Sequence, residues 1–143
     1  MFSKTCEYAI KTMVFIKTLE SKGEHIGLKL IANEISSPQA FTAKILQRLV
    51  RAKLLKSVRG PHGGFRINDR HGPIYLRDIV VAIDGDALFN QCVLGFEKCS
   101  SENPCAVHHK FNSIRYDLEK TLTETQLEEI AGVVTSGNGV LKL

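Results

Sequence analysis

The 143-residue sequence lacks a long uninterrupted run of apolar side chains. A helix needs roughly 18 such residues to cross a membrane, so the pattern argues against a membrane-spanning protein. Residues 1–7, MFSKTCE, also lack the apolar core of a secretory signal. We therefore expect a cytoplasmic protein. In that compartment clustered cysteines bind metal or carry redox chemistry more often than they form structural disulfides.

Several enzyme motifs are missing as well. The glycine-rich stretch at residues 60–64 is not followed by the Gly-Lys-Ser/Thr of a Walker loop, and no glycine fingerprint opens a helix. No Glu or Asp stands inside a recognised zinc-enzyme motif, where it would act as a general base. Internal repeats and low-complexity segments are also absent. We expect one folded domain that is not an enzyme.

Acidic side chains are nearly absent from about a quarter of the chain. Residues 38–71 hold eight Lys or Arg and the single acid Asp69, a local net charge of +7. Residues 72–143 hold six basic and ten acidic residues, a local net charge of −4. A basic surface on an otherwise acidic body is typical of proteins that bind nucleic acid.

The basic region carries the pattern of a helix-turn-helix. Apolar residues at helical spacing predict helices over residues 4–21, 28–35 and 38–53. The last two are short and joined by a tight turn, and the third has a polar outer face. Its residues expected to face solvent are Gln39, Thr42, Lys44, Gln47, Arg48 and Arg51.

Residues 55–67 follow with two short strand patterns around a glycine-rich turn, which predicts a β-wing. Glycines in such a turn let the backbone approach a phosphate or a minor groove without Cβ clashes. We therefore predict binding to a double-stranded DNA operator. The residues expected to contact the DNA are Gln39, Thr42, Lys44, Arg48, Ser57, Arg59, His62 and Arg66.

The C-terminal half predicts three more helices, over residues 76–83, over about 17 residues after Cys105, and from Thr123 through Ala131. The longest has apolar residues spaced by four, three, four and four. Such a stripe fits a dimer seam, or intramolecular core if the chain is monomeric. Its members are Val107, Phe111, Ile114, Leu118 and Leu122. The expected fold is mainly α with a small β-wing, a winged helix-turn-helix plus a long C-terminal dimerisation helix.

Three of the four cysteines fall within fourteen positions, at Cys92, Cys99 and Cys105, and His108 and His109 follow at once. Thiolates beside an imidazole favour a soft metal. Zinc and an iron-sulfur cluster both accept such ligands, so the spacing alone leaves the metal open. The fourth cysteine, Cys6, lies on the apolar stripe of the first helix and is expected to be a core residue.

Four motifs together resemble a family of bacterial winged-helix regulators, which includes the iron-sulfur regulator IscR and the nitric-oxide sensor NsrR. The resemblance covers nearly the whole chain. Within it, Lys53 stands where many relatives have glycine, and the first cysteine gap is one residue longer than in IscR-type members. The motifs are Glu7-Tyr8-Ala9-Ile10, the run LLKSVRGPHGGF at residues 54–65, the segment LRDIVVAIDG at residues 76–85, and Cys92-x6-Cys99-x5-Cys105.

The resemblance implies a homodimeric repressor or activator whose operator affinity is tuned by an iron-sulfur cluster, [2Fe-2S] in preference to [4Fe-4S]. The cluster would sense redox state, iron-sulfur status or nitric oxide. By the same resemblance the ligands are Cys92, Cys99, Cys105 and His108, and Glu7 of the partner subunit is the alternative fourth ligand. A zinc site, a thiol switch and an electron-transfer iron-sulfur protein remain alternatives.

The expected organisation has three parts. Residues 1–86 form the winged helix-turn-helix domain, residues 87–106 form the cluster-binding loop, and residues 107–143 form the dimerisation helix and C-terminal segment.

Overall fold

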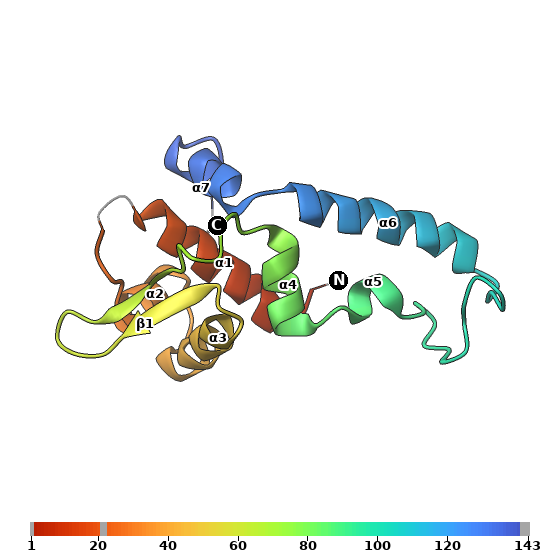
Figure 1. Ribbon diagram of the computed structural model, residues 1–143, viewed down its shortest axis with the longest axis horizontal. Coiled ribbons are helices and arrows are strands. Elements are labelled where there is room, and N and C mark those ends of the chain that lie inside the picture. The colour runs from red at the N-terminus through yellow and green to blue at the C-terminus, as the bar shows by residue number, and fades with distance from the viewer. Residues whose placement is uncertain (1, 21–22, 141–143) are drawn as a thin grey trace.

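A winged helix-turn-helix forms the body of the molecule, and a long helix with a cysteine-rich loop extends from it (Figure 1). The computed structural model describes residues 2–20 and 23–140. In these ranges no helix has the length and apolar content to cross a membrane. The elements are α1 (Lys4–Thr18), α2 (Leu28–Glu34), α3 (Gln39–Arg51), β1 (Leu55–Val58), β2 (Gly64–Ile67), α4 (Leu76–Asp84), α5 (Ala87–Asn90), α6 (His108–Glu124) and α7 (Leu127–Thr135).

Helix α1 is the central element of the core. The Ser3 hydroxyl caps its first turn and accepts a hydrogen bond from the Cys6 backbone N–H at 3.1 Å. Its apolar stripe is completely buried at Cys6, Ala9 and Met13, as the helical spacing predicts. The helix ends at Thr18, before the predicted end at residue 21, and residues 21 and 22 lie outside the described residues.

Helices α2 and α3 form the predicted helix-turn-helix. Helix α3 buries Ile45, Leu46 and Leu49 completely, so its inner face is fixed by the core and its outer face is presented to solvent. The turn between the helices is closed by the Ser37 backbone N–H, which donates to the Ala32 carbonyl at 2.9 Å. Core packing therefore sets the orientation of the basic helix.

Strands β1 and β2 pair in antiparallel register, from Leu55 opposite Ile67 to Val58 opposite Gly64. This hairpin is the predicted wing. The chain enters it through Lys53, whose φ of 61° lies in the left-handed region that favours glycine. The Asn68 side-chain amide donates to the Lys53 carbonyl at 2.7 Å and holds this turn.

The C-terminal helices divide into one that leaves the body and one that returns to it (Figure 1). Helix α6 continues to Glu124, and α7 runs from Leu127 to Thr135 rather than from Thr123 to Ala131. Helix α7 packs back on the body, because Leu127 and Ala131 belong to the same core as α1.

The apolar stripe predicted for α6 serves two environments. Leu122 is buried, and Leu118 packs against the core of its own chain. Ile114, nearer the cysteine loop, is 57% exposed, and the neighbouring Tyr116 is 67% exposed. The half of α6 nearest the body is therefore intramolecular core, and the outer half presents apolar side chains to solvent.

Candidate metal centre and nucleic-acid interface

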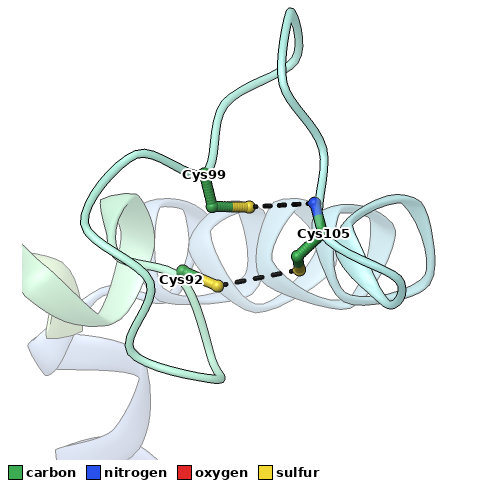
Figure 2. A group of neighbouring side chains, drawn as sticks. All are labelled: Cys92, Cys99 and Cys105. Atoms are coloured by element: carbon green, nitrogen blue, oxygen red, sulfur yellow. Dashed lines mark hydrogen bonds between the residues drawn. The ribbon is translucent and has the colours of Figure 1, made fainter.

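The three clustered cysteines converge on one point. The Sγ atoms of Cys92, Cys99 and Cys105 all lie within 4.8 Å of one another (Figure 2). Cys92 and Cys105 face each other, with their Sγ atoms 3.7 Å apart. The Cys105 backbone N–H points at the Cys99 sulfur over 3.4 Å. Three thiols that a linear sequence separates by six and five residues are thus brought together as one ligand set.

Tight turns in the loop produce this convergence. The Gly95 backbone N–H donates to the Cys92 carbonyl at 2.9 Å, and Gly95 has the positive φ of 75° that such a turn needs. A second turn is closed by the Ser100 N–H, which donates to the Asn103 carbonyl at 3.2 Å, just before Pro104. Between these turns Phe96 is 58% exposed, and the three cysteines are half-buried and lie outside the core.

His108 is the imidazole that reaches the cysteines. It begins α6, is 8% exposed, and its Nδ1 lies 3.2 Å from the Cys99 sulfur. It contacts this one sulfur rather than all three. His109 next to it is exposed to solvent. The histidine predicted from the resemblance therefore lies at the site within a single chain.

Glu7, the alternative ligand, lies elsewhere in the chain. It is half-exposed on α1 and forms an ion pair with Lys4, with Nζ and Oε2 2.8 Å apart. The hydrogen bond from Lys4 lowers the pKa of the Glu7 carboxyl. Among the described residues, the ligand atoms gathered at the site are the three sulfurs, and Glu7 is not among them. It could reach a site only from a second copy of the chain.

The pKa values of Cys92 and Cys99 are shifted in opposite directions. Hydrogen bonds from the backbone at Phe96, which outweigh burial, lower the pKa of Cys92 to about 7. The backbone N–H of Cys105 also favours the Cys99 thiolate, but burial and the neighbouring sulfurs outweigh it and raise the Cys99 pKa. For Cys99, ionisation of a neighbouring sulfur thus opposes formation of the thiolate, and a bound cation would offset this repulsion.

Cys6 takes no part in the site. It is completely buried in α1, and burial raises the pKa of its thiol to about 12, with a further contribution from the Asp84 carboxylate. It is the neutral core residue that its place on the apolar stripe predicts.

Two arginines, which sequence reasoning missed, tie the cysteine loop to the body. Arg115 on α6 donates from Nη1 to the Gln91 carbonyl at 2.5 Å, one residue before Cys92. Arg77 on α4 pairs with Glu119 on α6 at 3.1 Å, and its guanidinium lies 5.2 Å from the centroid of the Phe89 ring on α5. No local sequence pattern indicates these contacts, because the hydrogen-bonding partners are 24 and 42 positions apart.

The predicted DNA-contacting residues lie on α3 and on the wing. Seven of the eight have side chains that reach the surface there, either exposed or half-buried. Arg66 is one of the half-buried residues, and its guanidinium lies 3.8 Å from the Asp69 carboxylate, which also pairs with Lys56. The seven are Gln39, Lys44, Arg48, Ser57, Arg59, His62 and Arg66.

The expectation that Thr42 faces solvent is wrong. Its side chain is completely buried, and its hydroxyl donates to the Pro38 carbonyl at 3.0 Å. A threonine inside a helix can satisfy its hydroxyl in this way with the carbonyl one turn earlier, so the polar group tolerates burial. Thr42 is therefore part of the packing beneath α3 and is not available to DNA.

Arg48 is exposed, but one nitrogen of its guanidinium is turned to the protein. Its Nη2 donates to the carbonyl of Ile83 in the last turn of α4, where helix carbonyls lack a partner within the helix. This contact joins the basic helix to the element that leads into the cysteine loop. We interpret Arg48 as a residue that positions α3, which differs from the direct DNA contact expected from the sequence.

Salt dependence distinguishes these two roles. The slope of log K against log salt is negative for a protein–DNA complex, and removing one phosphate contact reduces its magnitude by about 0.9. We expect Lys44→Gln to reduce this magnitude for a random-sequence duplex by about that amount and Arg48→Gln to leave it unchanged. Fluorescence anisotropy over a salt series measures both. An equal reduction in the magnitude of the slope for the two variants would show that Arg48 contacts phosphate.

The fold and this surface define a class of protein, the winged-helix transcriptional regulators. A family model described as Rrf2, iron-dependent transcriptional regulator, matches residues 2–132. The chain belongs to the Rrf2 family. The family inferred from the motifs and the fold class predicted from the sequence are both confirmed.

Relatives and solved structures agree with this placement. A protein of Aquifex aeolicus described as an HTH-type transcriptional regulator is 28% identical over 136 residues, which cover 93% of this chain and 92% of that one. The regulator NsrR of Oceanobacillus iheyensis is 24% identical, with 89% and 86% covered. Among structures, the fold is similar to CymR, the global cysteine regulator of B. subtilis (TM-score 0.75, 23% identity, 92% and 96% covered), and to T. potens IscR (TM-score 0.74, 18% identity, 98% and 92% covered).

Proposed function

We propose that the chain is a homodimeric DNA-binding regulator whose operator affinity is controlled by an iron-sulfur cluster, held by Cys92, Cys99 and Cys105. The observation that carries this proposal is the convergence of the three Sγ atoms within 4.8 Å of one another. The family is one of transcriptional regulators, and relatives named IscR and NsrR are among those that match.

The residues present fit such a group. Three sulfurs face one another at a half-buried site, and an imidazole stands against one of them. Thiolate and imidazole are the ligand types that iron-sulfur clusters use. When bound, the cluster supplies a centre that responds to redox state, to iron-sulfur supply or to nitric oxide. We favour [2Fe-2S] over [4Fe-4S], with His108 as fourth ligand and Glu7 of a second copy as the alternative.

The chain's own contacts supply a route from the loop to the DNA-binding helix. Arg115 holds the carbonyl of Gln91 at the start of the loop, and Arg77 holds Phe89 on α5. At the other end of α4, the Ile83 carbonyl accepts from Arg48 on α3. A change in loop order would therefore alter how α4 supports α3. A ligand biases such an equilibrium only by its differential affinity for the two states.

Each of the three parts expected from the sequence has its own role in this proposal. Residues 1–86 bind DNA through α3 and the wing, and residues 87–106 hold the cluster. Residues 107–143 contribute the dimer surface, for which the exposed apolar side chains of Ile114 and Tyr116 on outer α6 are the support. A homodimer would read two half-sites about one helical turn apart, roughly 34 Å.

Metal content tests the proposal first. The full chain is purified without oxygen and analysed for iron, acid-labile sulfide and zinc. We expect iron and sulfide in equal amounts together with visible absorption. One zinc ion per chain without sulfide would contradict the cluster and would instead indicate a zinc site with the same ligands.

The fourth ligand is tested by two single substitutions. We expect His108→Ala to shift the visible and electron paramagnetic resonance spectra of the loaded protein, because His108 lies against a sulfur in the same chain and Glu7 does not. Glu7→Ala is the matched control, and His109→Ala controls for loss of a neighbouring imidazole. A spectrum that changes with Glu7→Ala and not with His108→Ala would assign the ligand to the partner subunit.

A further inference from the structure

The three sulfurs of the site are not equivalent to one another. The Cys92 and Cys105 side chains point at each other, with Sγ atoms 3.7 Å apart (Figure 2). The Cys99 sulfur is engaged differently, because it faces the Cys105 backbone N–H at 3.4 Å and the His108 Nδ1 at 3.2 Å. The geometry therefore selects one pair and holds the third thiol by other groups.

The selected pair can close with little disturbance. A disulfide needs its sulfurs about 2.05 Å apart, so the pair must move together by roughly 2 Å or less. Every residue from 93 to 104 is exposed or half-buried, so the segment between the two cysteines has no core packing to break. Pairing Cys99 with either neighbour would instead give up its contact with His108. Cys6 is completely buried in α1 and is not available.

We propose that Cys92 and Cys105 form an intramolecular disulfide in the cluster-free protein when it meets a peroxide. This proposal rests on the proposed function only in that a bound cluster would occupy the same sulfurs. The thiolate of one cysteine attacks a peroxide oxygen, the O–O bond breaks, and hydroxide leaves as water after protonation. The sulfenic acid is then attacked by the other thiolate, the S–S bond forms, and a second water leaves.

The overall change oxidises two thiols to one disulfide and reduces one hydrogen peroxide to two waters. Two of the three metal-binding sulfurs are then withdrawn, and Cys99 stays as a free thiol beside His108. The disulfide would hold the regulator in its cluster-free state until a dithiol reduces it. After oxidation the site therefore cannot take up a cluster until the disulfide is reduced.

Peptide mapping tests the pairing directly. Cluster-free full chain is prepared without oxygen, treated with one equivalent of hydrogen peroxide, alkylated at acidic pH, and cut with trypsin and a glutamate-specific protease. Cuts after Lys98 and Glu102 place the three cysteines on separate peptides. We expect the Cys92 peptide joined to the Cys105 peptide. A dominant link from Cys99 to either neighbour, or links between chains, would overturn the proposal.

Thiol counting gives an independent readout. The chain has four free cysteines, of which Cys6 is buried. We expect reactive thiols in the native protein to fall from three to one on oxidation, with Cys6 counted only after denaturation. Cys99→Ser should keep the disulfide, and Cys105→Ser should lose it. Formation of a disulfide at the same rate in Cys105→Ser would contradict the assignment.

Reloading with ferrous iron and sulfide separates this inference from the proposed function. If the reduced chain takes up a cluster, the oxidised chain should do so only after dithiothreitol is added. Equal uptake by both forms would show that the disulfide does not block cluster binding. If neither form takes up a cluster, the proposed function fails and the peptide map still decides the disulfide.

Discussion

Replacing Cys99 by alanine is expected to leave the purified protein nearly free of iron. Cys99 is one of three sulfurs within 4.8 Å of one another, and it is the one that contacts His108. Its loss removes a thiolate and also the group that the imidazole faces. Since changes even in supporting groups cost about 10–100-fold in metal affinity, loss of a direct ligand should cost at least that much. Iron and sulfide content per chain, with the visible spectrum, measure the effect.

Cys6→Ala is the matched control for this experiment. It removes a thiol of the same chemistry from the buried face of α1. We expect full iron content and a loss of unfolding free energy of about 1 kcal/mol, the ordinary cost of a small buried truncation. Iron content that falls equally in both variants would mean that the loop is not the binding site.

The second large effect is expected from Gly64→Ala in the wing. A Cβ at Gly64 would lie 2.5 Å from the Ile26 carbonyl oxygen, and its φ of 144° is one that L side chains rarely adopt. The neighbouring Phe65 exchanges two backbone hydrogen bonds of 2.9 Å with Ile26, which the clash would break. We expect roughly 2–4 kcal/mol less unfolding free energy, from backbone strain and broken hydrogen bonds. Urea denaturation measures it.

Duplex affinity should fall in the same variant, because Arg59 and His62 stand on the displaced hairpin. Gly72→Ala provides the control. Gly72 has a φ of 82°, and among the described atoms none lies within 4 Å of an added Cβ. The Gly72→Ala variant should lose about 1–2 kcal/mol of unfolding free energy from backbone strain alone and keep its duplex affinity. Equal losses in both variants would contradict the role given to the contact with Ile26.

The sequence predicted those elements whose pattern is local and repeated. The periodic apolar residues of α1, α3 and α6 indicated helices, because burial of one face fixes a helix over several turns. The glycine-rich turn indicated the wing for a similar reason, since few residues tolerate its backbone. Helix α5 was missed because four residues are too few to show a period.

What the sequence could not predict depends on contacts between distant positions. The burial of Thr42 follows from its hydrogen bond to Pro38 and the close packing under α3. The contact between Arg48 and Ile83 joins residues 35 positions apart. The sequence around a basic residue on a helix does not indicate whether that residue will contact DNA or a carbonyl of the protein.

The candidate metal site shows the same division. Clustered cysteines indicated a ligand set, because thiols close in sequence can meet through short turns. His108 and Glu7 could not be ranked by spacing, and the fold brings His108 rather than Glu7 to the sulfurs in one chain. The opposite pKa shifts of Cys92 and Cys99 arise from backbone N–H groups and neighbouring sulfurs, which only the folded loop places.

Control of DNA binding by the cluster is the central claim, and one paired measurement tests it. Duplexes bound by the anaerobically purified protein are selected from a random library, and affinity for the best duplex is measured before and after the cluster is removed by a chelator. We expect iron-containing, coloured protein whose affinity for that duplex changes at least 10-fold on cluster removal, with little change for random duplex. Equal affinity for the selected duplex with and without iron, or a colourless protein that binds it fully, would contradict the claim.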